Sequence, residues 1–175
     1  MEGLPPIIDS KTKILILGTC PSEESLQNKK YYQKSGNILL KVIGLNKDYS
    51  EKELLNKNIG FWDVFKNFEY SNKIGSSDKG RIFGEVNDFQ KKIFNNKCNI
   101  TSIIFNGYGS CKTKEKKRTS AVKEFLNKYD SSLKEKDIFW IILPSTSPNN
   151  RAIIDDEQKL FIWKQTLKRK KNENP

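Results

Sequence analysis

The sequence predicts an α/β fold: a three-layer α/β/α sandwich around a short, mainly parallel four-stranded sheet. The chain has 175 residues, 35% of them hydrophobic, which suits one domain with one core. Continuous apolar runs alternate with segments in which hydrophobic residues recur at helical spacing. Strands that alternate with helices form βαβ units, whose strands run parallel. We expect one domain over residues 1–168 and a basic, flexible tail over residues 169–175.

Four apolar runs are the predicted strands. Three of them are uninterrupted, which is typical of strands buried on both faces. The fourth contains Gly60 and is a less regular strand. The runs are residues 13–18, 59–65, 100–105 and 138–143.

The segments between these runs predict helices. A short helix carries Leu39 and Leu40 and ends near Gly44, and two more cover residues 86–94 and 122–129. The last helix begins at Asp155 or Asp156, where a carboxylate can cap it. Its expected buried side chains are Leu160, Phe161, Trp163 and Leu167.

The absence of histidine excludes much chemistry. The chain contains no histidine, so a nucleophile activated by an imidazole base is ruled out. Its three cysteines, Cys20, Cys98 and Cys111, are one ligand short of a four-thiolate cluster. An odd, scattered set of cysteines suits a reducing compartment. We expect no cofactor and no metal site.

The net charge favours a polyanionic partner. Lys and Arg number 32 against 21 Asp and Glu, so the formal charge is 32 − 21 = +11. The positive charge is concentrated in residues 112–118 and 164–171, which suits DNA or RNA or a merely solvated lysine-rich surface. No apolar run is long enough to span a bilayer, and residues 1–6 do not resemble a signal peptide. We expect a monomer without membrane contact, cytoplasmic and nucleoid-associated, or nuclear in a eukaryote.

Ligands of parallel sheets bind in the loops after the strands. The turn after Gly18 lacks the ending of a phosphate-binding loop and, taken alone, favours an ordinary strand-to-helix turn in which Ser22 caps a helix. Residues 144–148 place three hydroxyls between two prolines, which suits a phosphate or a set of Ser/Thr turns. Tyr31 and Tyr32 can stack on a base or pack internally, and Asn37 can orient a water or occupy a turn.

Taken in order, these motifs resemble the uracil-DNA glycosylase superfamily, most closely its hypoxanthine-DNA (deoxyinosine) glycosylase branch. The resemblance runs from about Ile14 to Asn150. Its motifs are Gly18-Thr19-Cys20-Pro21-Ser22, Ser25-Leu26, Tyr31-Tyr32, Asn37-Ile38-Leu39-Leu40, Ile59-Gly60-Phe61-Trp62-Asp63-Val64, Asn87-Asp88-Phe89, Phe105-Asn106-Gly107 and Leu143-Pro144-Ser145-Thr146-Ser147-Pro148.

The resemblance implies that a deaminated base is removed from DNA by hydrolysis of its N-glycosidic bond, with Asn37 as the catalytic residue. We expect Asn37 to place a water under the C1′ atom of a flipped-out nucleotide. The expected base pocket comprises Thr19, Cys20, Tyr31, Tyr32, Asp63 and Asn106. The expected DNA contacts are Ser22, Ser145, Thr146, Ser147, Asn149, Asn150 and Arg151, the last three also as candidate wedge residues.

The sequence departs from the branch motifs at two places, of which the first bears on base selectivity. Cys20 stands where the branch has Phe, and Leu39-Leu40 where it has Phe-Trp, which affects core packing. Leu143 stands where the uracil-specific branch has histidine, which disfavours that branch. The alternatives are a uracil or mismatched-pyrimidine DNA glycosylase, a non-catalytic DNA-binding member of the fold, and an enzyme of free nucleosides.

Overall fold

The central sheet of the computed structural model has four strands in the order β2-β1-β5-β8, and every neighbouring pair is parallel. The structure describes residues 1–70, 81–95, 99–113, 118–148 and 155–172. Register places Gly18 opposite Asp63 and Asn106 opposite Leu143, so the carboxyl ends of the strands share one edge. The four predicted strands are confirmed as β1 Ile14–Gly18, β2 Ile59–Asp63, β5 Ser102–Asn106 and β8 Phe139–Leu143.

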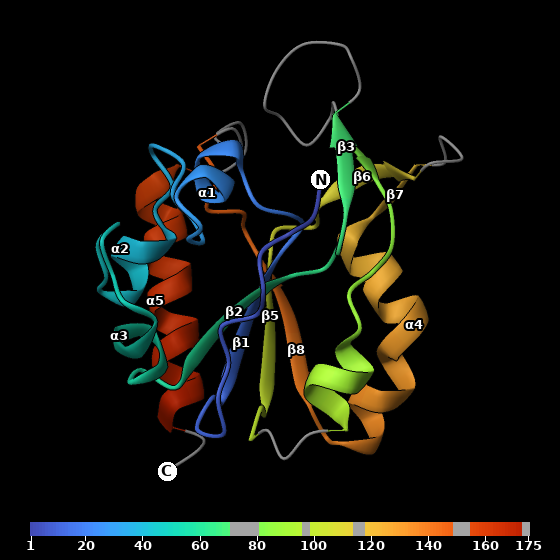
Figure 1. The fold of residues 1–175 in the computed structure, drawn as a ribbon. Helices are drawn as coiled ribbons and strands as arrows, with labels where there is room; N and C mark the ends of the chain where they lie inside the picture. The colour runs from blue at the N-terminus through green and yellow to red at the C-terminus, as the bar shows by residue number, and fades with distance from the viewer. Residues whose placement is uncertain (71–80, 96–98, 114–117, 149–154, 173–175) are drawn as a thin grey trace.

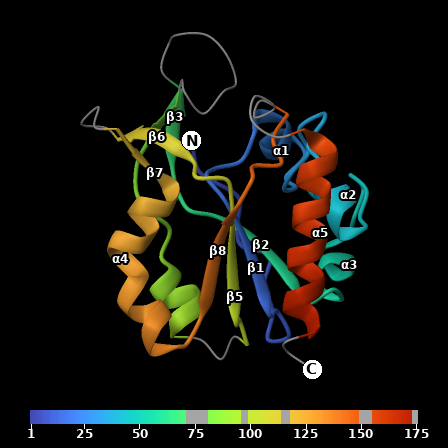
Figure 2. The same ribbon diagram turned by 180° about the vertical axis from the view of Figure 1, so that it is seen from behind.

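Helices cover both faces of this sheet, which confirms the three-layer fold (Figures 1 and 2). On one side lie α2, α3 and the long helix α5, and on the other lie α4 and the π-helical turn η2. The remaining helix, α1, follows β1 at the end where the strands stop. The bounds are α1 Glu23–Gln27, α2 Leu39–Ile43, α3 Glu51–Leu55, η2 Gln90–Phe94, α4 Ala121–Glu135 and α5 Asp156–Asn172.

Local sequence explains where these helices begin and end. The Ser22 hydroxyl accepts a hydrogen bond from the Ser25 N–H at 3.1 Å and caps α1. Gly44 ends α2 with a φ of 71°, a left-handed conformation that glycine adopts without a steric penalty. Asp155 accepts from the Gln158 N–H at 2.7 Å, as expected of the residue that caps α5.

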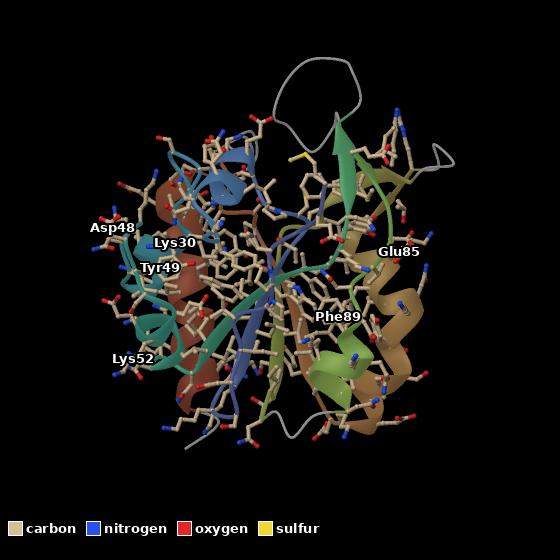
Figure 3. The ribbon with its side chains drawn as sticks, in the orientation of Figure 1. Lys30, Asp48, Tyr49, Lys52, Glu85 and Phe89 are labelled. Carbon is tan, nitrogen blue, oxygen red and sulfur yellow. The ribbon has the colours of Figure 1, made fainter. Side chains whose placement is uncertain are left out.

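Two aromatic clusters fill the space between the sheet and its helices. Beneath α4, the centroid of the Phe89 ring lies 4.8 Å from that of Phe125 and 4.4 Å from that of Trp62. Figure 3 shows Phe89 pointing inward between the sheet and α4. On the other face, Tyr32 and Tyr49 pack edge-on against Phe61. Leu39 and Leu40 are also buried, which confirms that this pair packs in the core.

A second sheet, in the order β3-β4-β6-β7, was not predicted. Its strands are short and rich in polar or charged residues, so they lack the apolar run that marks a buried strand. Only the β4–β6 pair is parallel, and the outer pairs are antiparallel. The strands are β3 Phe68–Tyr70, β4 Arg81–Phe83, β6 Ser110–Thr113 and β7 Arg118–Ser120.

Three details of the prediction are wrong. Strand β8 lies at the sheet edge and is not buried on both faces, since Phe139 and Trp140 are exposed. Phe161 is 64% exposed because it lies on the outer face of α5, whereas Trp163 is fully buried. No tail begins at residue 169, because α5 continues through Asn172. Within the described ranges, no helix is long and apolar enough to cross a membrane.

The two phenylalanines form a matched pair that tests this packing. Replacing Phe89 by Ala leaves a cavity under α4, so we expect the free energy of unfolding to fall by about 3–5 kcal/mol. The control Phe161→Ala, at an exposed position, should change it by less than about 0.5 kcal/mol. Urea denaturation measures both values, and equal losses would contradict the described packing.

Candidate functional site

The carboxyl ends of β1, β2 and β5 bring Gly18, Asp63 and Asn106 to the same edge of the sheet. A Cβ atom on Gly18 would lie 2.4 Å from Asp63 Oδ1 and 3.5 Å from the Tyr32 hydroxyl. Only glycine therefore allows the carboxylate to lie this close to the end of β1. Asp63 is buried, with 3% of its surface exposed.

Tyr32 is held in an uncommon conformation beside this carboxylate. Its φ is 59°, in the left-handed region that bulky residues rarely adopt. Burial, and secondarily the charge of Asp63, raise the pKa of its hydroxyl well above 10, while the Asn106 side chain offsets part of that rise. The phenol is therefore neutral near pH 7. Strained residues cluster at functional sites, where their surroundings hold them in place.

Asn37 lies at the start of α2, half-buried, with its side-chain orientation fixed by two hydrogen bonds. Its Oδ1 accepts from the Leu39 N–H at 2.9 Å and from Thr146 Oγ1 at 3.0 Å. Because both donors meet the same atom, that atom is the carbonyl oxygen of the amide rather than the nitrogen. Both lone pairs of Oδ1 are used, so Asn37 offers its Nδ2–H₂ group as a donor. Nδ2 makes no hydrogen bond to the part of the chain that the structure describes.

Thr146 connects Asn37 to the end of strand β5. Asn106 Nδ2 donates to Thr146 Oγ1 at 2.8 Å, and Asn106 Oδ1 accepts from the Thr146 N–H at 2.8 Å. The hydroxyl can thus accept from Asn106 while it donates to Asn37. Thr146 is 1% exposed, so water does not compete for these bonds.

The loop around Thr146 is fixed from three directions. Trp163 Nε1, on α5, donates to the Pro144 carbonyl at 2.8 Å, and the Ile38 N–H donates to the Thr146 carbonyl at 3.3 Å. Ser145 lies so close to Gly107 that a Cβ there would be 2.7 Å from Ser145 Cβ. The hydroxyl that orients Asn37 therefore lies on a rigid support.

The structure brings together Tyr32, Asn37, Asp63, Asn106 and Thr146, all of which were sequence candidates. Half-buried Thr19 and Cys20 follow β1 at the same edge. Ser145 and Ser147 flank Thr146 and are half-buried.

Other candidates have different surroundings from those expected. Tyr31 is 2% exposed and donates to the carbonyls of Leu4 and Pro5 at 3.0 and 3.1 Å, so its ring belongs to the core and cannot meet a base in this conformation. Thr146 is too buried to contact DNA, and the Ser22 hydroxyl caps α1. Asn149, Asn150 and Arg151 lie outside the described residues.

Asn87 is a supporting residue whose role the sequence did not reveal. Its Nδ2 donates to the Asp63 carbonyl at 2.9 Å, and the Tyr129 hydroxyl donates to the Asn87 carbonyl at 2.7 Å. Together they tie the end of β2 to α4. Asn87 belongs to one of the family motifs in the sequence. Its hydrogen bond to Asp63 could not be predicted, because the two residues are 24 positions apart in the chain.

Comparison with known proteins supports the resemblance. The sequence profile described as the uracil DNA glycosylase superfamily matches residues 5–166. This chain belongs to the uracil-DNA glycosylase superfamily. It is 26% identical, with a TM-score of 0.65, to a Methanosarcina acetivorans protein whose solution NMR structure is that of a candidate uracil DNA glycosylase, covering 97% of this chain and 98% of the other.

Two relatives in this superfamily carry the name hypoxanthine DNA glycosylase. The protein from Methanosarcina acetivorans is 35% identical over 50% of this chain and 60% of its own length. The protein from Methanosarcina barkeri is 32% identical over 61% of this chain and 70% of its own length. The aligned regions therefore span about two thirds of these relatives.

Proposed function

We propose that this member of the superfamily is a monofunctional DNA glycosylase that hydrolyses the N-glycosidic bond of a deaminated base, hypoxanthine in deoxyinosine. The observation that carries the proposal is the pair of hydrogen bonds that fixes the Asn37 amide, with Oδ1 accepting from two donors and the Nδ2–H₂ group left as a donor. The names of the two Methanosarcina relatives support hypoxanthine as the base. The positive charge of +11 suits a DNA substrate.

The duplex hides the bond to be broken, so the nucleotide must first leave the stack. Flipping costs a few kcal/mol, and less for a mispaired base such as hypoxanthine opposite thymine. Of the two tyrosines expected in the base pocket, Tyr31 is buried in the core, so we assign the stacking role to Tyr32, which lies beside Asp63. The Asp63 carboxylate would accept from N1–H of hypoxanthine at the floor of this pocket.

Cleavage of the bond gives an oxocarbenium-like sugar, which a weak nucleophile can attack. In the proposed mechanism, Asn37 Nδ2 donates to a water oxygen and holds that water beneath C1′. An amide donor orients the water without removing its proton, so slow turnover is expected. The base would leave as an anion stabilised by backbone N–H donors near Thr19 and Cys20, and it would take up, through solvent, the proton that the water loses as the C1′–O bond forms.

A second candidate keeps the mechanism and changes the base to uracil. The name of the structural relative as a candidate uracil DNA glycosylase favours it. Duplexes with single hypoxanthine, uracil or xanthine lesions, assayed for abasic sites, separate the two. Release of hypoxanthine fastest supports the proposal, and release of uracil alone would replace it.

The catalytic role of Asn37 predicts a loss of rate without a loss of binding. We expect Asn37→Ala to lower the single-turnover rate on deoxyinosine DNA by about 10²–10³-fold, because a fixed donor is removed. DNA affinity, measured by anisotropy, should change by less than about threefold. Excision at the parental rate would show that Asn37 does not position the water.

The Thr146 hydroxyl predicts a positioning effect that a matched pair of variants can isolate. Thr146→Val keeps the shape of the side chain and removes the two hydrogen bonds of the hydroxyl, to Asn37 and from Asn106, so we expect kcat to fall by about tenfold or more. KM should change little, since Thr146 is buried. Thr146→Ser retains the hydroxyl and should recover most of the rate, whereas equal kcat values in the two variants would refute the role.

A further inference from the structure

A groove with a volume of about 730 Å³ lies along the β6–β7 hairpin and the start of α4, and the proposed chemistry does not use it. We call it the hairpin groove. Its lining includes Tyr108, Lys112, Arg118, Ser120 and Lys123. It contains part of the basic segment at residues 112–118.

The hairpin groove holds like charges close together, which destabilises the fold. Lys112 of β6 lies directly opposite Arg118 of β7 in the antiparallel register, and both side chains are exposed. Like charges at such positions repel each other. Lys123 adds a third cation, and no carboxylate lines the groove within the described residues. A polyanion bound in the groove would offset this repulsion, because each cation would then lie beside a negative charge.

The rim of the groove carries an exposed aromatic ring. Tyr108 is 55% exposed and stands between Gly107 and Gly109, both with positive φ. A Cβ on Gly109 would lie 2.5 Å from Thr19 Oγ1 and 2.8 Å from Ala121 Cβ, so the loop is tightly packed. The ring is thus presented on a constrained backbone, as a stacking platform requires.

The groove lies next to the candidate site. Tyr108 follows Asn106 by two residues, and Gly109 contacts Thr19 after β1. Figure 1 shows the β6–β7 hairpin and the start of α4 at the end of the molecule where β1 and β5 stop. A DNA strand that enters the site therefore has a basic path leading away from it.

We propose that the hairpin groove binds unpaired nucleotides of the lesion-bearing strand, with Tyr108 stacked on a base and Lys112 and Arg118 on phosphates. A charged groove combined with an aromatic platform is the arrangement that single strands recognise. The inference rests on the proposed function, since it takes DNA as the substrate.

Anisotropy with an undamaged, labelled single strand of about 16 nucleotides tests the groove without requiring catalysis. We expect Tyr108→Ala to weaken binding by about tenfold. A plot of the logarithm of the association constant against the logarithm of the salt concentration has a negative slope. In the double variant Lys112→Ala/Arg118→Ala this slope should be shallower by about 1.4, at about 0.7 per lost phosphate contact. The matched control Lys52→Ala/Lys136→Ala removes two exposed charges away from the groove and should leave Tyr108-dependent stacking unchanged, with a smaller change in slope (Figure 3 shows Lys52).

A blunt undamaged duplex serves as the second arm. We expect Tyr108→Ala to alter its affinity by less than about twofold, because paired bases offer no free face. Equal losses on both DNA forms, or a control variant as impaired as the groove variant, would overturn the inference. Melting temperatures confirm that each variant is folded. If the wild-type protein excises no lesion yet binds single strands through the groove, the proposed function is refuted and the inference about the groove still holds.

Discussion

The candidate site depends on one buried hydroxyl. Thr146 Oγ1 lies between the amides of Asn106 and Asn37, and neither of these hydrogen bonds is exposed to competing water. Leaving a buried polar group unpaired costs about 1–3 kcal/mol, so the three side chains are held together rather than merely adjacent. The orientation of Asn37 follows from this constraint, because its carbonyl oxygen is held by Thr146 and Leu39 and its amide nitrogen remains as the donor.

The parallel sheet makes this constraint possible. Asn37 and Thr146 are 109 residues apart in the chain, yet the segment between α1 and α2 meets the loop after β8 at the edge where the parallel strands end. Trp163 then ties that edge to α5 through the Pro144 carbonyl. The layers around the sheet thus act as the support that an oriented but weakly activating amide needs.

Much of the fold was readable from the sequence because buried parallel strands and amphipathic helices leave strong patterns. Strands such as Ile14–Gly18 are apolar throughout, and Gly44 and Ser22 mark helix ends by their local chemistry. The second sheet left no such pattern, since its strands are short and polar. The exposure of Phe161 also depends on which face of α5 meets the sheet, which composition alone does not specify.

The site was predictable as a set of residues but not as an arrangement. The motifs pointed to Asn37, Asp63 and Asn106: the strand ends bring Asp63 and Asn106 to one edge, and Thr146 holds Asn37 beside Asn106. They did not distinguish Thr146, which is buried, from the serines beside it, nor Tyr31 in the core from Tyr32 near Asp63. Those distinctions arise from tertiary contacts between distant segments.

The most direct test of the account is a crystal structure of the protein bound to a duplex that carries a deoxyinosine analogue with an uncleavable glycosidic bond. If Asn37 positions the water, the complex will contain a flipped nucleotide with a water beneath C1′ at about 3 Å from Asn37 Nδ2, while Oδ1 still accepts from Thr146. A water held by another group, or an Asn37 amide turned away from the sugar, would contradict it.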